Sequence, residues 1–348
     1  MHRFEIRAAA PIRICDLGGW TDTWFAGHGA VFNLAVSPAV EAHVEVHAAD
    51  ALPDRVTLNV ESFGDRYSFE PGDGPGRHPL LEAVIEETGV PDATTVEIRI
   101  ASQVPPGCAT GTSASTSVAL IGALDALAGR RRTPGEIAAI AHRIEAERLG
   151  LQSGVQDQLC AAFGGISYIE VESYPDVVSR SPLAMPGGTR SALEGRLLLL
   201  YVGSAHSSSD MHERVIARLV EEGTASPRLE RLRRCARAAR DAVVAGDLRR
   251  LGQLMVENTE VQEQLHEDLV STAAHQAIHV AATLGAAGWK VNGAGGEGGS
   301  LTILCGDDDV GRRRELEGAL LKADPRFQLI PIKLCPDGLR VRRAPIRA

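Results

Sequence analysis

A segment rich in glycine and hydroxyl residues, VPPGCATGTSASTS at 104–117, has the clearest chemical potential in this sequence. It precedes an apolar run, VALIGALDALAG, with the composition of a helix, so we expect a loop that ends at a helix N-terminus. Unpaired N–H groups and the positive end of the helix dipole make such a terminus a site for phosphate. Gly107 and Gly111 would let the backbone approach the ligand closely. The hydroxyls that could meet phosphate oxygens or a metal ion belong to Thr110, Thr112, Ser113 and Ser115.

Three other interpretations of this segment are a capped turn, a Walker A loop and a hydrolase nucleophile motif. A polar turn could merely cap the helix with a Thr or Ser side chain. The Walker A pattern G-x-x-x-x-G-K-[ST] does not fit, because Ser113 stands where the lysine is required. The hydrolase pattern G-x-S-x-G fails at its last position, where Ser115 replaces glycine. Nucleotide chemistry is therefore the first hypothesis, with the capped turn as its alternative.

Acidic residues follow in IEAERLGLQSGVQDQLCAAFGG at 144–165. Glu145 and Glu147 close a predicted helix, and Asp157 lies beyond a short loop among apolar and small neighbours. Such neighbours indicate partial burial, and a buried carboxylate needs a cation, a metal ion or hydrogen-bond donors. Two acids brought together here could hold Mg²⁺, which takes few protein oxygens, and activate a hydroxyl. The alternative is that these acids lie on a solvent-facing surface.

A second glycine-rich segment, VNGAGGEGGSLTILC at 291–305, lies between two predicted strands. It places five glycines within residues 293–299, which costs conformational entropy unless the backbone must approach another group closely. A flexible hairpin is the alternative.

A charged segment near the N-terminus, APIRICDLGGWTDTW, combines a predicted strand with a glycine turn at Gly18 and Gly19. It presents Arg13, Asp16 and Asp22 around that turn. The alternative is a structural ion pair between Arg13 and Asp22, with the tryptophans at 20 and 24 in the core.

Alternating strands and helices must position these segments. Strands are predicted at 4–8, 30–36, 40–47, 55–60, 94–101, 165–171, 196–203, 289–292, 299–305, 326–334 and 338–343. Helices are predicted at 78–89, 112–128, 134–149, 156–163, 208–222, 227–245, 247–266, 271–285 and 308–322. Thr133 is the expected N-cap of the third helix, with Pro134 in its first turn.

Composition narrows the class of protein. The 348 residues are 44% hydrophobic, and a net charge of −9 argues against a general nucleic-acid binder. No apolar run reaches the ~18–20 residues that a membrane span needs, so we expect no membrane partner and a cytoplasmic location. The six cysteines form no CxxC pair, which indicates reduced thiols rather than a zinc or redox motif.

The four segments, in this order, resemble the motifs of the GHMP kinase superfamily, which includes galactokinase and the homoserine, mevalonate and phosphomevalonate kinases. PPGCATGTSAS resembles the family's phosphate-loop motif, with Ala109-Thr110 in place of the usual Gly-Leu. VNGAGGEGGS resembles its third motif, with Glu297 intruding into the glycine run. The first motif of fucokinase-type domains is similar to RICDLGGWTDTW in this chain. A segment of heptose 7-phosphate kinases is similar to ERLGLQSGVQDQLCAAFGG.

The resemblance implies a two-domain α+β fold with the active site between the domains. The N-terminal domain, residues 1–190, would be an α/β nucleotide-binding domain like domain 2 of a ribosomal protein. The C-terminal domain, residues 191–348, would be a ferredoxin-like α+β domain. A homodimer is left open.

The resemblance also implies a role for individual residues. Asp157 matches the catalytic aspartate that accepts the hydroxyl proton, and Arg13 would keep it ionised and stabilise charge in transit. Mg²⁺ would be held by Ser113 and Glu147. The ATP phosphates would be bound by Pro106, Gly107, Cys108, Ala109, Thr110, Gly111, Thr112, Ser113 and Ser115. The substrate would be bound by Asp22, Gly18, Gly19, Trp20, Gly154, Gly293, Ala294, Gly295 and Gly296.

These roles predict a kinase that uses ATP and Mg²⁺ to phosphorylate a small molecule. The expected acceptor is a hydroxyl, with the anomeric one favoured, of fucose, arabinose, a uronic acid, heptose 7-phosphate or a similar sugar. Alternatives are a kinase for a non-sugar alcohol such as mevalonate or homoserine, a non-catalytic sugar- or nucleotide-binding paralogue, and a serine hydrolase built on Ser113.

Overall fold

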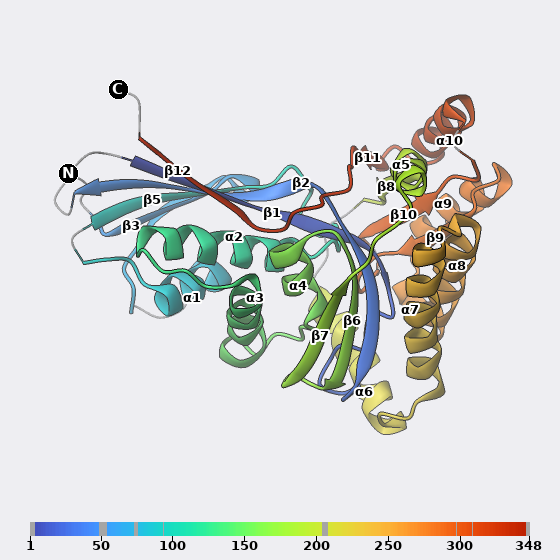
Figure 1. The fold of residues 1–348 in the computed structure, drawn as a ribbon, viewed down its shortest axis with the longest axis horizontal. Helices are drawn as coiled ribbons and strands as arrows, with labels where there is room; N and C mark the ends of the chain where they lie inside the picture. Colours follow the sequence, from blue (N-terminus) through green and yellow to red (C-terminus); the bar gives the residue numbers. More distant parts are fainter. Residues whose placement is uncertain are drawn as a thin grey trace.

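The structure, a computed structural model, describes residues 4–48, 54–72, 76–92, 94–203, 208–296, 298–307 and 309–345. Two sheets organise this part of the chain, one on each side of the molecule in Figure 1. Among the described helices, none is long and apolar enough to cross a membrane. All six cysteines are free thiols, as the sequence predicts.

The first sheet has eight strands, with the order β12-β1-β2-β5-β3-β4 and with β6 and β7 added alongside β2. Their bounds are β1 Phe4–Leu17, β2 Gly29–Ala48, β3 Val56–Val60, β4 Asp65–Phe69, β5 Thr94–Ala101, β6 Ile166–Ser173, β7 Val177–Pro182 and β12 Arg340–Pro345. Only the β3–β5 pair is parallel in the described sheet. The last strand therefore returns to pair with the first, antiparallel to it.

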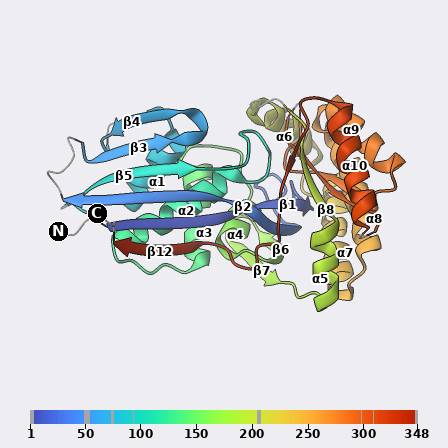
Figure 2. The same cartoon turned by 90° about the horizontal axis from the view of Figure 1, so that it is seen from above.

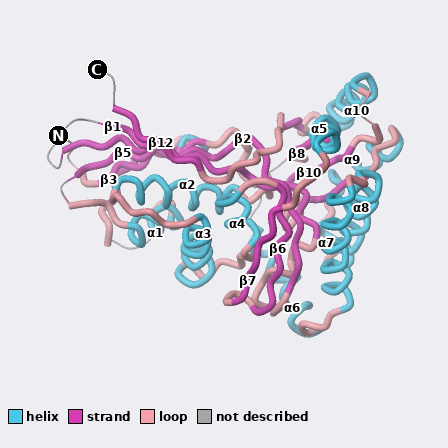
Figure 3. The backbone as a smooth tube through the Cα atoms, in the orientation of Figure 1, coloured by secondary structure: helices cyan, strands magenta, loops and turns pink. Residues whose placement is uncertain are grey.

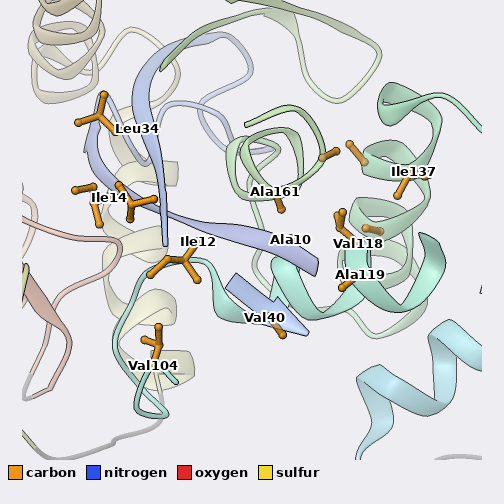
Figure 4. Close-up of a cluster of buried hydrophobic side chains, with 14 of the residues drawn as sticks. Ala10, Ile12, Ile14, Leu34, Val40, Val104, Val118, Ala119, Ile137 and Ala161 are labelled. Carbon is orange, nitrogen blue, oxygen red and sulfur yellow. The ribbon is translucent and has the colours of Figure 1, made fainter. Parts of the chain in front are cut away.

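Four helices cover one side of this sheet, as Figures 1 and 3 show, and Figure 2 shows the strands in front of them. They are α1 Pro79–Thr88, α2 Thr112–Leu127, α3 Pro134–Arg143 and α4 Gln156–Phe163, with a π-helical turn, η2 Ile144–Arg148, after α3. Helix α2 is buried on most of its surface because it lies in the middle of this layer. Figure 4 shows Val118 and Ala119 of α2 in one hydrophobic cluster with Ile12 of β1 and Ala161 of α4.

The second sheet is antiparallel, with the order β11-β8-β10-β9. Its strands are β8 Leu197–Tyr201, β9 Gly288–Val291, β10 Ser300–Leu304 and β11 Gln328–Ile330. The helices of this half are α5 Gly187–Arg196, α6 Ser208–Glu222, α7 Pro227–Ala245, α8 Leu248–Leu265, α9 Thr272–Thr283 and α10 Val310–Ala323. Short 3-10 turns occur at η1 Glu61–Phe63 and η3 Glu267–Leu269. The whole is the two-domain α+β architecture that the sequence predicts.

The structure differs from the predicted elements in a few places. Two predicted strands, 30–36 and 40–47, form the single long strand β2, and β4, β7 and α5 were not predicted. The predicted helix 134–149 begins as expected, with Thr133 and Glu136 forming a reciprocal capping box, but its last turn is π-helical. The return of β12 to the first sheet also places residues of the predicted second domain within the first.

Candidate active site

Four elements meet where the two halves of the molecule join. They are the end of β1, the loop that leads into α2, the start of α4, and the loop between β9 and β10. Gly111 shows how close they are: a Cβ added to it would lie 3.0 Å from Cγ of Asp157 and 3.3 Å from Cγ of Arg13. Gly293 of the fourth segment also lies against Arg13 and Ala109, so the structure brings together residues from all four segments singled out in the sequence.

Arg13 and Asp157 form a two-pronged ion pair at this junction. Arg13 Nε donates to Asp157 Oδ1 at 2.7 Å, and Nη2 donates to Oδ2 at 3.3 Å. The guanidinium is 6% exposed; burial acts to lower the pKa of Arg13, but the charges of Asp157 and Asp16 outweigh it and the pKa is raised. This geometry fixes the Asp157 carboxylate in the first turn of α4.

The loop of residues 106–111, which we call the amide loop, has its carbonyl groups fastened to the rest of the protein. Tyr201 Oη donates to the carbonyl of Pro106 at 3.4 Å, Gly299 N to that of Gly107 at 3.0 Å, and Ser300 Oγ to that of Cys108 at 2.6 Å. Arg13 donates to the next two carbonyls, from Nη1 to Ala109 at 2.6 Å and from its backbone N to Thr110 at 3.0 Å. In a trans peptide the N–H of the next residue points opposite to the C=O. The N–H groups of residues 107–111 therefore point away from those donors, and no hydrogen bond within the described residues uses them.

The backbone angles of the amide loop suit an anion. The φ angle is positive at Gly107, Ala109 and Gly111, at 75°, 56° and 70°. Conformations of alternating hand turn successive N–H groups toward one point and form an anion-binding nest. Ala109 adopts the left-handed region despite its Cβ, which marks a conformation imposed by the surrounding contacts.

The hydroxyls at the start of α2 divide into two groups. Ser113 is exposed in the first turn, and the hydroxyls of Thr110 and Thr112 lie 3.3 Å apart. Ser115 is buried, and its Oγ donates to the Pro11 carbonyl at 2.7 Å. Ser115 therefore fastens α2 to β1, and its hydroxyl is engaged by the carbonyls of Pro11 and Gly111.

The two acids at the end of the third helix lie in different surroundings. Glu147, the expected metal ligand, is exposed, whereas Glu145 is 5% exposed. Glu145 Oε2 accepts hydrogen bonds from Ser153 Oγ at 2.8 Å and Gln158 Nε2 at 2.7 Å. Its Oε1 is buried and has no hydrogen-bond partner within the described chain. Of the two acids, Glu145 is the buried one, and its charge is coupled to that of Asp157.

Burial raises the pKa of Glu145 to about 7, and the charge of Asp157 adds to the effect. A buried carboxylate with one unpaired oxygen can be a ligand of a divalent cation, which would supply the partner that this oxygen lacks. In the described ranges, no three His, Cys, Asp or Glu side chains come together as a closed metal cluster. A site with so few protein ligands, here Glu145 and the hydroxyl of Ser113, fits Mg²⁺, which binds to proteins through few side chains and keeps waters and phosphate oxygens as its other ligands.

Asp22 lies at the N-terminus of α4, beside Asp157. Its Oδ2 accepts from Gln156 N at 3.0 Å, and burial raises the pKa of Asp22 to about 6. The approach of this carboxylate explains Gly154, where an added Cβ would lie 2.2 Å from Asp22 Oδ2. The charge of Asp157 also acts to raise the pKa of Asp22, so the two carboxylates are electrostatically coupled.

The two tryptophans of the first motif have different environments. Trp20, an expected substrate residue, is buried in a hydrophobic cluster with Phe25 and residues of α6, α7 and α8. Trp24 is 49% exposed, and its Nε1 donates to Gln152 Oε1 at 2.8 Å. Trp24 therefore spans from the first motif to the loop that carries Gly154, a position that the sequence did not distinguish from core.

Residues of α7 and α8 hold the first motif in place. The buried guanidinium of Arg233 donates to the carbonyls of Ala26 and His28, and Asn258 Oδ1 accepts from Gly18 N at 2.8 Å. Gly18 also lies close to Ala30: a Cβ added to Gly18 would lie 2.0 Å from the Ala30 carbonyl oxygen. These contacts give the first motif a packing role across the junction.

In the segment of residues 293–299, which we call the glycine loop, four glycines direct their N–H groups to acceptors within the protein. Gly293 N donates to the Asp16 carboxylate, and Gly295 N donates to the Asn292 carbonyl. Gly296 N donates to the Leu269 carbonyl, and Gly299 N donates to the Gly107 carbonyl. Ala294 packs against the Trp20 cluster, and a Cβ on Gly19 would lie 2.8 Å from Asp16 Oδ2. The glycines expected to bind substrate thus pack against protein groups, and Glu297 lies outside the described residues.

This chain is similar to a known protein family and to several kinases. The model for the GHMP kinases N terminal domain matches residues 78–165. A mevalonate kinase of Pyrococcus abyssi is 30% identical over 91% of this chain and 94% of its own length. The D-glycero-alpha-D-manno-heptose 7-phosphate kinase of Campylobacter jejuni is 27% identical over 84% and 87%. The fold is shared with a D-glycero-D-manno-heptose 1-phosphate kinase structure from Bacteroides thetaiotaomicron, with a TM-score of 0.74, 22% identity and 97% and 98% coverage.

Proposed function

This chain belongs to the GHMP kinase family, and on that premise we propose that it transfers the γ-phosphate of ATP to a hydroxyl of a monosaccharide or sugar phosphate. Kinase activity on an alcohol follows from the family, whereas the sugar, the metal ion and the residue roles are our proposal. We also propose a division near residue 190, with β12 crossing back to complete the first domain.

The observation that carries the proposal is the position of Asp157. Its carboxylate is fixed by Arg13 and lies against Gly111, where the amide loop meets the N-terminus of α2. A base at this point can accept a proton from a hydroxyl while the γ-phosphate is held by the N–H groups of residues 107–111. Arg13 orients the base, and its positive charge lies where charge moves during transfer.

For the metal site we propose Glu145 in place of Glu147, together with Ser113. Glu145 carries the buried oxygen without a partner, and Ser113 lies exposed at the start of α2. Mg²⁺ bound there would neutralise charge on the phosphates.

The acceptor side favours a substrate bound through its hydroxyls over one bound through a carboxylate. Asp22 places a second acidic group beside the base, and a carboxylate can accept several sugar hydroxyls. A mevalonate carboxylate would instead need a cation. The nearby cation of Arg13 is already engaged by Asp157 and the Ala109 carbonyl, and that of Arg233 by loop carbonyls.

Trp24 supports the same choice. Its half-exposed ring is anchored through Nε1, and such an aromatic surface suits the apolar face of a sugar ring. The second candidate, a mevalonate kinase, is favoured by the likeness to the Pyrococcus abyssi enzyme.

An ADP-release assay with ATP and Mg²⁺ tests these candidates. The panel contains free hexoses, pentoses and uronic acids, heptose phosphates, mevalonate and homoserine. We expect turnover with a sugar or sugar phosphate and none with mevalonate; turnover with mevalonate alone would select the second candidate. ATP binding without turnover on any alcohol would indicate a non-catalytic binder, and labelling of Ser113 by a fluorophosphonate would indicate a hydrolase.

A further inference from the structure

Asp16 is a buried carboxylate on which donors from both halves of the molecule converge. It is 2% exposed and lies three residues after Arg13 on β1. Its oxygens accept from Gly293 N at 3.1 and 3.2 Å, and they lie 3.5 Å from Lys290 Nζ and 3.7 Å from Arg13 Nη1.

Lys290 is unusual in this chain, which has only three lysines, at 290, 322 and 333. It is 1% exposed on β9, and its ammonium group donates to Gln262 Oε1 at 2.8 Å and to the Val291 carbonyl. Burial lowers the pKa of Lys290, while the charge of Asp16 opposes that effect. A compact ammonium with three donors matches these two acceptors and Asp16, whereas a planar guanidinium would not.

Gly293 is the point where this buried pair reaches Arg13. Its N–H is held by Asp16, and its carbonyl accepts from Gln262 Nε2 at 2.8 Å, so its peptide groups are fixed on both sides. A Cβ added to Gly293 would lie 3.1 Å from Arg13 Nη2 and 2.9 Å from the Ala109 carbonyl. Gly293 therefore lies closely packed beside the guanidinium, and its displacement would change the packing around Arg13.

We propose that Lys290 and Asp16 act as a positioning pair, which holds Gly293 against Arg13 and thereby fixes Arg13 on Asp157. Neither residue touches the reacting groups; both act through Arg13. The inference rests on the proposed function, because Arg13 and Asp157 are the residues whose geometry the pair serves.

A double variant, Asp16→Leu with Lys290→Met, separates positioning from stability. Lys290→Met alone leaves a buried carboxylate without its ammonium and should lower Tm strongly, whereas removal of both charges should restore much of Tm. Positioning predicts that kcat of the double variant stays at least about tenfold below wild type, with KM for ATP changed less than about threefold. Recovery of kcat together with Tm would overturn the proposal.

Three further measurements complete the test. Lys322→Met removes an exposed lysine in the last turn of α10 and serves as the matched control, with kcat and Tm unchanged. If the apolar pair fails to fold, Asp16→Asn with Lys290→Gln replaces it, and a wild-type kcat in that variant would equally overturn the proposal. A crystal structure of the folding double variant supplies a readout that needs no turnover.

We expect that crystal structure to show Gly293 displaced from residue 16 and Arg13 Nε withdrawn from Asp157. An Arg13–Asp157 pair that persists at the present 2.7 Å would overturn the inference even if kcat fell. If the wild-type protein phosphorylates no alcohol in the panel, the proposed function fails, and this structural readout still decides whether the pair positions Arg13.

Discussion

The amide loop and the glycine loop are both rich in glycine, yet their backbones face opposite ways. In the amide loop the carbonyls of residues 106–110 are bonded to the protein and the following N–H groups are left for a ligand. In the glycine loop the N–H groups of Gly293, Gly295, Gly296 and Gly299 are themselves bonded to the protein. Glycine content alone therefore does not indicate a phosphate site; the direction of the peptide groups does.

The two loops also differ in what they do for each other. Gly299 N donates to the Gly107 carbonyl, and Ser300 Oγ donates to the Cys108 carbonyl. The glycine loop thus supports the amide loop from behind, which sets the direction of its peptides. One loop is proposed to bind the phosphates, and the other holds it in shape.

The largest expected effect separates phosphate binding from transfer. Asp157→Asn removes the proposed base while leaving the amide loop intact, so kcat should fall by about 10²–10⁴-fold. The dissociation constant for ATP, measured by calorimetry, should change little. Asp176→Asn, an exposed aspartate in the β6–β7 turn, is the control, and near-wild-type kcat in Asp157→Asn would refute the base assignment.

A methyl group on the glycine loop should affect transfer more than binding. Gly293→Ala would push a Cβ toward Arg13 and the Ala109 carbonyl at a φ of +57°. Because misplacement of about 1 Å can cost about 10²-fold, we expect kcat to fall 10- to 100-fold with ATP affinity retained.

Gly64→Ala provides the control for backbone strain. Its φ is +67° and an added Cβ would have no neighbour within 4 Å, so only Tm should fall and kcat should stay unchanged. If Gly293→Ala weakened ATP binding instead of kcat, the glycine loop would itself be part of the phosphate site.

The acids of η2 offer a smaller, paired test. Glu145→Gln should raise the Mg²⁺ concentration for half-maximal activity at least about tenfold, because it removes the charge of the buried oxygen without a partner. Glu147→Gln should leave it unchanged, since that side chain is exposed. The reverse result would restore Glu147 as the ligand.

The smallest effect is a pH dependence of stability. The pKa of Asp22 is raised from an ordinary 3.8 to about 6, so the folded protein binds this proton more tightly than the unfolded chain does. Its contribution to stability is therefore full below pH 4, is lost as pH rises toward 6, and is constant above. Asp22→Asn removes this loss, so Tm of the variant minus Tm of the wild type should increase by a few degrees between pH 4 and 7 in calorimetry. A difference independent of pH would contradict the shift.

Local patterns predicted most elements of the fold. Thr133, Pro134 and Glu136 marked the start of α3, and apolar composition marked α2. The pairing of β12 with β1 joins residues more than 300 positions apart, and no local pattern carries that information.

The sequence indicated which residues meet at the candidate site, but it did not indicate the direction in which several of their side chains point. Arg13 and Asp157 do come together, but only the fold could show that Ser115 faces Pro11 and that Trp20 rather than Trp24 is buried. Glu145 was within reach of the sequence, because it lies one helical turn after the buried Ala141. The helical spacing from Ala141 therefore favours Glu145 over Glu147 as the buried acid.

The return of β12 has a consequence for the order in which the protein matures during translation. The strand that carries Arg13 is made before the second sheet, whereas its neighbour at residues 340–345 is made after that entire sheet. Until then β1 has an open edge that can pair with other chains. Completion of the first sheet therefore follows synthesis of the second, in contrast to the usual N-terminal-first order.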